Sequence, residues 1–306
     1  MASLADTLGP ISARLGELEG DPVPLEGGIT NRNYRVQFAG EEVVVRLPGK
    51  DTELLEIDRG AERAAGELAA RAGIGPDVVA MLDQPPCLVT EFVAGEPMEP
   101  GELREPPVLA EVAAALRVLH SREELLPVEF SSFRIVETYA ARMADRGAEV
   151  PSSYEWALAA AHRIEAVLIG PEHDPVPCHN DLLAANFIRS PRGLRLIDWE
   201  YAGMNDRYFD LGNFAVNNEL DEAGEAELLS AYFGAPASAC RLASLRLMRF
   251  MSDFREAMWG AVQSTISDLD FDFTDYCAKH FERMRESAGE GRMEALLEEA
   301  GGAAPV

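Results

Sequence analysis

Two neighbouring stretches decide the fold and the chemistry of this chain: Cys178-His-Asn-Asp-Leu-Leu-Ala-Ala-Asn186 and Leu196-Ile-Asp-Trp-Glu-Tyr201. They bring an aspartate, Asp181, an amide, Asn186, and a second aspartate, Asp198, into one short part of the sequence. Phosphoryl transfer needs little more, because one carboxylate orients the acceptor hydroxyl while an amide and a second carboxylate hold metal ions on the phosphates. The sequence therefore predicts a phosphotransferase in which Asp181 is the catalytic base and Asn186 and Asp198 bind Mg²⁺.

The spacing of these residues is more informative than their identity. Any one of them alone would be an ordinary loop residue, because Asp and Asn are common in turns. Together they give H-x-D-x-x-x-x-N, which has the spacing of the protein-kinase catalytic loop. The apolar run at 193–197 predicts a strand that would present Asp198 at its end. We expect His179 to support the loop through hydrogen bonds without transferring protons.

The composition indicates a globular protein of one large or two moderate domains, with 306 residues and a hydrophobic fraction of 47%. No apolar run reaches the length of about 18 residues that a membrane helix needs, and the N-terminus lacks the layout of a signal peptide. The four cysteines are scattered, without metal-binding spacing. These features predict a cytoplasmic protein.

The charge balance predicts which partners the surface disfavours. The chain has 53 acidic and 27 basic residues, a net charge of −26. Such a surface repels nucleic acid and anionic membranes, so neither is expected as a partner. It is compatible with a small cationic substrate, although solubility is a simpler explanation. Whether the chain is a monomer or a homodimer stays open.

The first part of the chain is predicted to be rich in strands. We expect a helix within 1–20, a hairpin of strands at 33–38 and 42–47, a helix over 54–73, and two strands at 76–82 and 87–93. After a linker rich in proline and glycine at 95–101, the chain becomes mostly helical. Helices are predicted over 107–120, 135–146, 153–168, 210–219, 221–233, 238–267, 273–288 and 293–300.

Several of these segments resemble the choline/ethanolamine kinase family, within the broader aminoglycoside-phosphotransferase and protein-kinase-like fold. They are GGITNRNYRV (27–36), VVVRLPG (43–49), IDRGAE (57–62), VTEFVAGEP (89–97), LRVLH (116–120), HNDLLAAN (179–186), IDWEYAGMNDRYFDLGN (197–213), MWGAVQ (258–263) and DFTDY (272–276). The resemblance implies an α+β, two-lobed fold. A small β-rich lobe over 1–93 would bind ATP, and a larger, mostly helical lobe over 94–306 would carry catalysis and substrate binding.

The resemblance also implies a reaction: transfer of the γ-phosphate of ATP to the hydroxyl of a small amino alcohol such as choline or ethanolamine. Two alternatives remain open at this point. The acceptor could be another small molecule, such as an aminoglycoside, thiamine or a sugar-like metabolite. A nucleotide-binding pseudokinase is disfavoured, because the residues that the chemistry needs are all present.

Two segments of the first lobe are implied to bind the nucleotide. The glycine-containing loop with Gly28, Thr30 and Asn31 would cover the phosphates, because glycine lets backbone N–H groups approach closely. The strand end with Glu91 and Val93 would form the hinge, where backbone groups contact adenine. Taken alone, adjacent glycines before a strand are more often a plain turn.

Arg46 stands where related kinases carry a phosphate-binding lysine, and we expect it to act in both ATP binding and catalysis. Its guanidinium can contact phosphate oxygens and a carboxylate at once, and the expected carboxylate is Glu62. The alternative is a surface arginine paired with Glu41 or Glu42.

Three further polar residues follow the metal-binding aspartate. Glu200 is predicted to join the metal through water. Asp210 and Asn213 open the next predicted helix and either cap it or fix the catalytic loop, and capping is the favoured interpretation.

The acceptor site is implied by the resemblance at Tyr201, Trp259 and Tyr276, since small quaternary amines are bound in aromatic cages. Family members specific for choline tend to carry a second aromatic residue one helical turn before the tryptophan, and here that residue is Glu256. We expect Glu256 to share the pocket and to favour a primary amine over choline. The alternative is a solvated helix residue.

Overall fold

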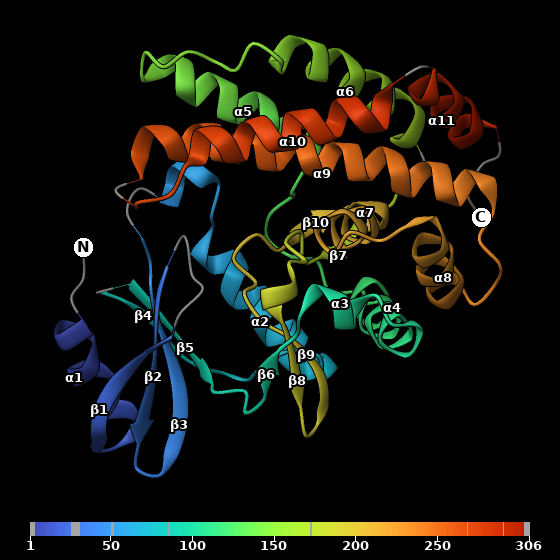
Figure 1. Cartoon of the computed structure of the whole chain (residues 1–306). Coiled ribbons are helices and arrows are strands. Elements are labelled where there is room, and N and C mark those ends of the chain that lie inside the picture. Colours follow the sequence, from blue (N-terminus) through green and yellow to red (C-terminus); the bar gives the residue numbers. More distant parts are fainter. Residues whose placement is uncertain are drawn as a thin grey trace.

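The protein is described here from a computed structural model, which covers residues 4–25, 31–49, 52–84, 86–171, 173–267, 269–289 and 291–302. Its first part is an antiparallel five-stranded sheet in the order β1-β2-β3-β5-β4, with helix α1 (Leu4–Leu15) beside it (Figure 1). The strands are β1 (Leu18–Leu25), β2 (Arg32–Phe38), β3 (Glu41–Leu47), β4 (Val78–Asp83) and β5 (Pro86–Glu91).

The hairpin of β2 and β3 forms as predicted. Phe38 pairs with Glu41, so the turn contains only Ala39 and Gly40, and both have positive φ, 47° and 86°. Two central residues with positive φ are typical of the hairpin turn that matches the twist of the strands. The buried faces of the two strands join Ile11 of α1 and residues of β4 and β5 in a small apolar core.

The short helix expected within 1–20 is present as α1, which ends at Leu15 because Gly16 has a φ of 101°; strand β1, which begins at Leu18, was not predicted. One boundary in this part differs from the prediction. The helix predicted over 54–73 is interrupted: a 3-10 turn, η1 (Thr52–Leu55), is followed by Glu56 with a φ of 61°. Helix α2 (Arg59–Ala72) starts only after Asp58, whose side chain caps it, and it ends at Gly73, as predicted.

The segment predicted as a linker is partly ordered into secondary structure. Strand β6 (Glu96–Pro97) pairs with β8 (Phe187–Ser190), which pairs with β9 (Gly193–Leu196), and α3 (Pro100–Leu103) follows β6. Gly95 passes so close to the next chain segment that a Cβ would lie 2.3 Å from the carbonyl oxygen of Arg189. The connection is therefore fixed to the strand pair that lies between Asn186 and Asp198, the two predicted metal ligands.

The second part of the chain is mostly helical, and its helices occur in the predicted order. They are α4 (Pro106–His120), α5 (Ser132–Asp145), α6 (Tyr154–Leu168), α7 (Arg207–Asn217), α8 (Glu222–Phe233), α9 (Ala239–Ile266), α10 (Phe273–Ala288) and α11 (Arg292–Gly301). Figure 1 shows the long α9 running across the molecule beside α10, with α5 and α6 on the far side of this pair from the sheet. Strands β7 (Val176–Cys178) and β10 (Gly203–Asn205), which were not predicted, pair beneath α9.

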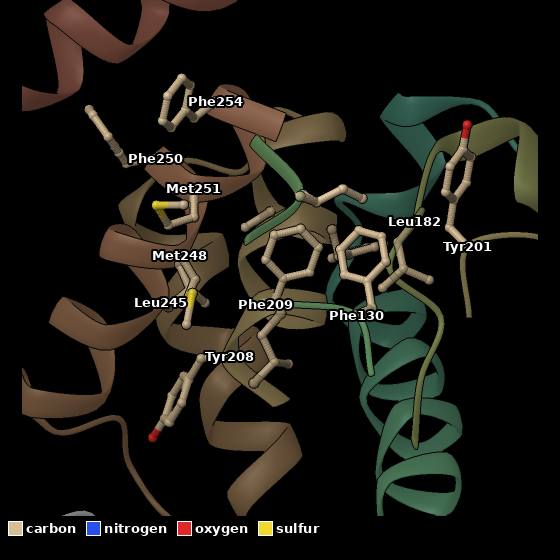
Figure 2. Close-up of a cluster of buried hydrophobic side chains, with 14 of the residues drawn as sticks. Phe130, Leu182, Tyr201, Tyr208, Phe209, Leu245, Met248, Phe250, Met251 and Phe254 are labelled. Carbon is tan, nitrogen blue, oxygen red and sulfur yellow. The ribbon is translucent and has the colours of Figure 1, made fainter. Parts of the chain in front are cut away.

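Close packing of α7 against α9 anchors the catalytic loop. Gly212 of α7 allows this approach, because a Cβ there would lie 2.7 Å from the backbone nitrogen of Arg249. Figure 2 shows Phe209 of α7 beside Phe130 and near Leu182 of the catalytic loop, with Tyr201 at the edge and its hydroxyl pointing away from Leu182. Leu182 is fully buried, so the loop is fixed to the core next to Asp181, the predicted catalytic base.

This architecture confirms the predicted α+β fold class, with an antiparallel sheet at the N-terminal side and helices after it. Within the described ranges, none of the helices combines the length and apolar character that a bilayer crossing requires.

Candidate active site

Two loops bring the predicted functional residues together: the connection from β7 to β8 and the connection from β9 to β10. Asp181 follows β7, Asn186 ends the 3-10 turn η2 (Ala184–Asn186), and Asp198 follows β9. Asn180 and Asp198 have φ values of 66° and 67°, a left-handed conformation that is uncommon for residues other than glycine. Such conformations persist where the surroundings enforce them, which is frequent at functional sites.

Helix α7 fixes the catalytic loop, residues 179–186, through hydrogen bonds to its backbone. Both oxygens of Asp210 accept backbone hydrogen bonds, from the nitrogen of His179 at 2.8 Å and from that of Asn180 at 2.7 Å. Asn213 accepts one from the nitrogen of Leu182. The favoured prediction, that Asp210 and Asn213 cap the helix, is wrong, because α7 begins earlier and Asp206 is its cap.

The loop should weaken when one of these acceptors becomes a donor. In Asp210→Asn, an amide NH₂ would face a backbone N–H group, so we expect a loss of about 1–3 kcal/mol in the free energy of unfolding and a lower kcat. Urea denaturation measures the first effect, and the initial rate of the predicted phosphotransfer measures the second. The matched control is Asp221→Asn at the exposed cap of α8, which should change little because asparagine caps helices as well as aspartate. Equal stability of the two variants would contradict this role of Asp210.

His179 supports the loop from the other side, as predicted. Its Nε2 lies 2.9 Å from the carbonyl oxygen of Ile197, and its Nδ1 accepts from the nitrogen of Asp181 at 3.3 Å. This pattern requires the proton on Nε2. Burial lowers the pKa of His179, so the imidazole is neutral and both its nitrogens are engaged.

Arg46 connects the sheet with the catalytic segment. Its Nη1 lies 2.9 Å from Oε1 of Glu62 on α2 and 2.6 Å from Oδ1 of Asp198. Burial opposes the charge, but Asp198 and Glu62 more than compensate and raise the pKa of Arg46. The expected contact with Glu62 is present, and the alternative pairing on the surface is not, since Glu42 pairs with Arg35 instead.

Glu200 is held by Asn31 and Arg59, close to the ion pair of Arg46. Nδ2 of Asn31 donates to its Oε2 at 2.7 Å, and Arg59 lies 3.4 Å from the same oxygen. Arg59 also bonds Glu62 at 2.7 Å. Burial, and then Asp198, raises the pKa of Glu200 to about 7. The predicted phosphate-loop residues Gly28 and Thr30 lie outside the described residues.

A cavity of about 310 Å³ opens between the sheet and the catalytic segment. Its walls combine apolar residues with Arg46, Glu62, the hinge residues Glu91 and Val93, and the pair Asn186 and Asp198. The hinge amides of Glu91 and Phe92 already donate to Asp77 and Glu42, and the Glu91 carboxylate pairs with Arg192. The structure thus brings Arg46, Glu62 and the hinge to the same cavity as the predicted metal residues, whereas Asn31 does not line it.

The donor atoms at this cavity fit a magnesium ion. Nδ2 of Asn186 donates to the carbonyl oxygen of Asp181 at 2.8 Å, so its carbonyl Oδ1 is the atom left for a ligand role. The hydrogen bond from Arg46 to Asp198 is accepted by Oδ1. Amide and carboxylate oxygens are the hard ligands that Mg²⁺ prefers.

Arg255 of α9 is a site residue that the sequence analysis missed. Its Nη1 lies 3.5 Å from Oδ1 of Asp181 and bonds Glu256. Burial raises the pKa of Asp181 to about 8, although Arg255 acts in the opposite direction. One feature of the sequence could have indicated this role. Arg255 lies one helical turn after Met251, so it is a charged residue on the apolar face of a long helix.

The four residues expected at the acceptor site do lie together. Nε1 of Trp259 donates to the Tyr201 hydroxyl at 2.9 Å, the rings of Trp259 and Tyr276 are 5.8 Å apart, and the Tyr276 hydroxyl donates to Oε2 of Glu256 at 2.7 Å. None of these four residues lines the cavity between the sheet and the catalytic segment.

Glu256 lies neither in a position open to the ammonium group of a substrate nor on the solvated face of its helix, the two environments considered from the sequence. It is 4% exposed, and its two oxygens accept from Arg255 and Tyr276. Burial alone would raise the pKa of Glu256, but Arg255, His280 and Tyr276 together lower it. It is therefore neither a solvated residue nor a carboxylate free to take an ammonium group, and its replacement would remove a partner of the buried Arg255.

Known proteins resemble this chain over most of its length. The model of the choline/ethanolamine kinase family matches residues 23–226. Ethanolamine kinase 2 of Homo sapiens is 31% identical over 287 residues, which cover 83% of this chain and 72% of that protein. A choline/ethanolamine kinase family protein from Mesorhizobium loti has a TM-score of 0.81 at 26% identity, covering 97% of this chain and 99% of that one. LicA in complex with AMP has a TM-score of 0.77 at 26% identity, covering 96% and 100%.

Proposed function

The chain belongs to the choline/ethanolamine kinase family, and from this premise we propose that it transfers the γ-phosphate of ATP to the hydroxyl of a small amino alcohol such as choline or ethanolamine. One observation carries the proposal. Arg46 of the sheet and Asp198 of the catalytic segment meet at 2.6 Å on the wall of a cavity that Asn186 also lines. That arrangement joins a phosphate-binding cation to two metal-binding side chains.

ATP would occupy the cavity between the sheet and the catalytic segment. A nucleotide is supported by the likeness to LicA, which was solved with AMP. The adenine base would lie against the hinge. The backbone amides of Glu91 and Phe92 already donate hydrogen bonds within the protein, so the amide of Val93 is the hinge donor proposed for adenine. Arg46 would contact the phosphates, and the segment with Gly28, Thr30 and Asn31 would cover them. Residues 1–93 would thus form the ATP-binding lobe, and residues 94–306 the catalytic lobe.

Asn186 and Asp198 would hold Mg²⁺ through their oxygens. When bound there, the ion neutralises charge on the phosphates. Asp181 would orient the acceptor hydroxyl and take its proton, while His179 and Asp210 hold the loop that carries it. Positioning is the main contribution of such a group, because a loose transition state asks little of the base.

The raised pKa of Asp181 gives the reaction a pH dependence. Below about 8 its carboxyl is protonated and cannot accept the proton of the acceptor hydroxyl. We therefore expect kcat/KM for the acceptor to rise with pH through this region and to level off above it. Initial rates of ADP release at saturating ATP measure the profile. If the same rise persisted in Asp181→Asn, it would belong to another group.

The acceptor is identified by a direct experiment. ADP release is measured with ATP and Mg²⁺ in the presence of choline, ethanolamine, thiamine or an aminoglycoside. We expect turnover with an amino alcohol. If all four acceptors gave ADP only at the background rate, the proposal would be contradicted.

A cytoplasmic location and the absence of nucleic-acid and membrane partners belong to the same proposal, and the net charge of −26 supports them.

A further inference from the structure

Asp198 has a strained backbone conformation that the chain must hold from both sides. Its φ is 67°, and a residue with a Cβ incurs an energetic cost in this left-handed region. On the N-terminal side, the nitrogen of Ile197 donates to the carbonyl oxygen of Asn186 at 3.0 Å, and the carbonyl oxygen of Ile197 lies 2.9 Å from Nε2 of His179. Strain of this kind persists only where the surroundings enforce it, so the residues after Asp198 need an anchor as well.

Glu200 provides an anchor on the C-terminal side. Its side chain is buried, and its Oε2 accepts from Nδ2 of Asn31 at 2.7 Å and lies 3.4 Å from Nη1 of Arg59. Asn31 is buried too, and its Oδ1 accepts from Nη2 of Arg59 at 3.3 Å. The amide of Asn31 therefore has one orientation, because its oxygen must face the arginine and its NH₂ group must face the carboxylate.

Arg59 connects this contact to the ion pair of Arg46. Its Nη1 bonds Oε2 of Glu62 at 2.7 Å, and Oε1 of the same carboxylate bonds Arg46 at 2.9 Å. Arg46 in turn bonds Asp198 at 2.6 Å. Residues of β3 and α2 thus hold the side chain of Asp198 directly and, through Glu200, the backbone two residues after it.

The position of Glu200 suits an anchor better than a metal site. Asp198 and Trp199 line the cavity between the sheet and the catalytic segment, but Glu200 is not among the residues that line it. The sequence predicts that Glu200 joins the metal through water, which would require its carboxylate to face that cavity. Its Oε2 instead faces Asn31 and Arg59.

We propose that Glu200 is a positioning residue: its contact with Asn31 and Arg59 fixes the backbone after Asp198, so that the Asp198 carboxylate stays available to the magnesium ion. This inference rests on the proposed function, to which the ion and the nucleotide belong. It also accounts for Asn31, which is buried beside the site without lining the nucleotide cavity.

The test exchanges the two groups that make the contact. Asn31→Asp places two carboxylates against each other in a buried site, where like charges repel strongly, whereas Glu200→Gln keeps an acceptor for Asn31. In the double variant Asn31→Asp/Glu200→Gln, the new amide can donate to the new carboxylate, which also faces Arg59. The hydrogen bond is then restored with donor and acceptor exchanged. The matched control is Glu67→Gln, which removes a carboxylate of the same charge at the surface of α2.

The first measurement is the affinity for ADP with and without Mg²⁺, by calorimetric titration. A displaced Asp198 weakens only the part of the affinity that depends on Mg²⁺. The ratio of the two affinities should therefore fall by about fivefold or more in Asn31→Asp, while metal-free ADP binds as it does to the wild type. In Glu200→Gln and in the double variant, the ratio should lie within about twofold of the wild type.

Two results of this titration would overturn the inference. If Glu200 reached the ion through water, Glu200→Gln would lose the Mg²⁺-dependent affinity and the double variant would not recover it. If metal-free ADP lost as much affinity as Mg²⁺-ADP in Asn31→Asp, the contact would support the site in general and not Asp198. Glu67→Gln should leave both affinities unchanged.

Urea denaturation of the metal-free protein tests the contact itself. Asn31→Asp should unfold at a lower urea concentration than the wild type, and the double variant should recover most of the difference. This series also separates the inference from the proposed function. A wild-type protein whose ADP affinity did not respond to Mg²⁺ would contradict the proposed function. The urea series would then decide the inference, and a double variant no more stable than Asn31→Asp would overturn it.

Discussion

Replacing Asp198 with alanine is expected to remove nearly all turnover, lowering kcat by roughly 10³-fold or more. The substitution deletes the only carboxylate among the two residues expected to hold Mg²⁺. It also leaves Arg46 with Glu62 alone, although Asp198 lies 2.6 Å from the guanidinium and helps to orient it. The affinity for Mg²⁺-ATP should fall as well, which calorimetric titration of the nucleotide in the presence of Mg²⁺ measures.

Two controls make this prediction specific to the metal. Asp198→Asn keeps the shape of the side chain and one oxygen but loses the charge. Its kcat and its affinity for Mg²⁺-ATP should therefore lie between those of the wild type and of Asp198→Ala. Thermal unfolding of each variant shows whether the fold survives. Activity without any divalent ion, or a normal Mg²⁺ dependence in Asp198→Ala, would assign the metal to other residues.

The second large effect is expected at Asp181. An amide has the same shape but cannot accept the proton of the acceptor hydroxyl, so Asp181→Asn should lower kcat by ~10²–10⁴. ATP binding should change little, because Asp181 does not line the nucleotide cavity. Single-turnover rates and ATP titrations separate these two quantities. The matched control is Asp206→Asn, the same change at the cap of α7. Turnover near the wild-type rate in purified Asp181→Asn would remove Asp181 from this role.

Local signals account for the parts of the structure that the sequence predicted well. The hairpin at Ala39 and Gly40 requires only alternating strands and a turn with positive φ. The cluster of Asp181, Asn186 and Asp198 follows from their closeness in the sequence. Arg46 and Glu62 are near enough along the chain that a strand followed by a helix brings them together.

The parts that could not be predicted depend on contacts between distant segments. Strands β7 and β10 have three residues each, too few for a periodic pattern. Helix α7 begins at its cap Asp206, four residues before Asp210, and the contact of Asp210 with the distant backbone of His179 could not be read from the sequence. Arg255 reaches Asp181 only because α9 crosses the catalytic loop, and no pattern within α9 indicates that crossing.

The ion pair between Arg46 and Asp198 also constrains how the chain acquires activity during folding. The two residues are 152 positions apart, so closing this contact carries a large entropic penalty unless the intervening segments are already ordered. The pair should therefore form late, after the sheet and the helices have each assembled. A refolding chain would regain helical content before it regains nucleotide binding, so catalytic competence reports the final step of folding.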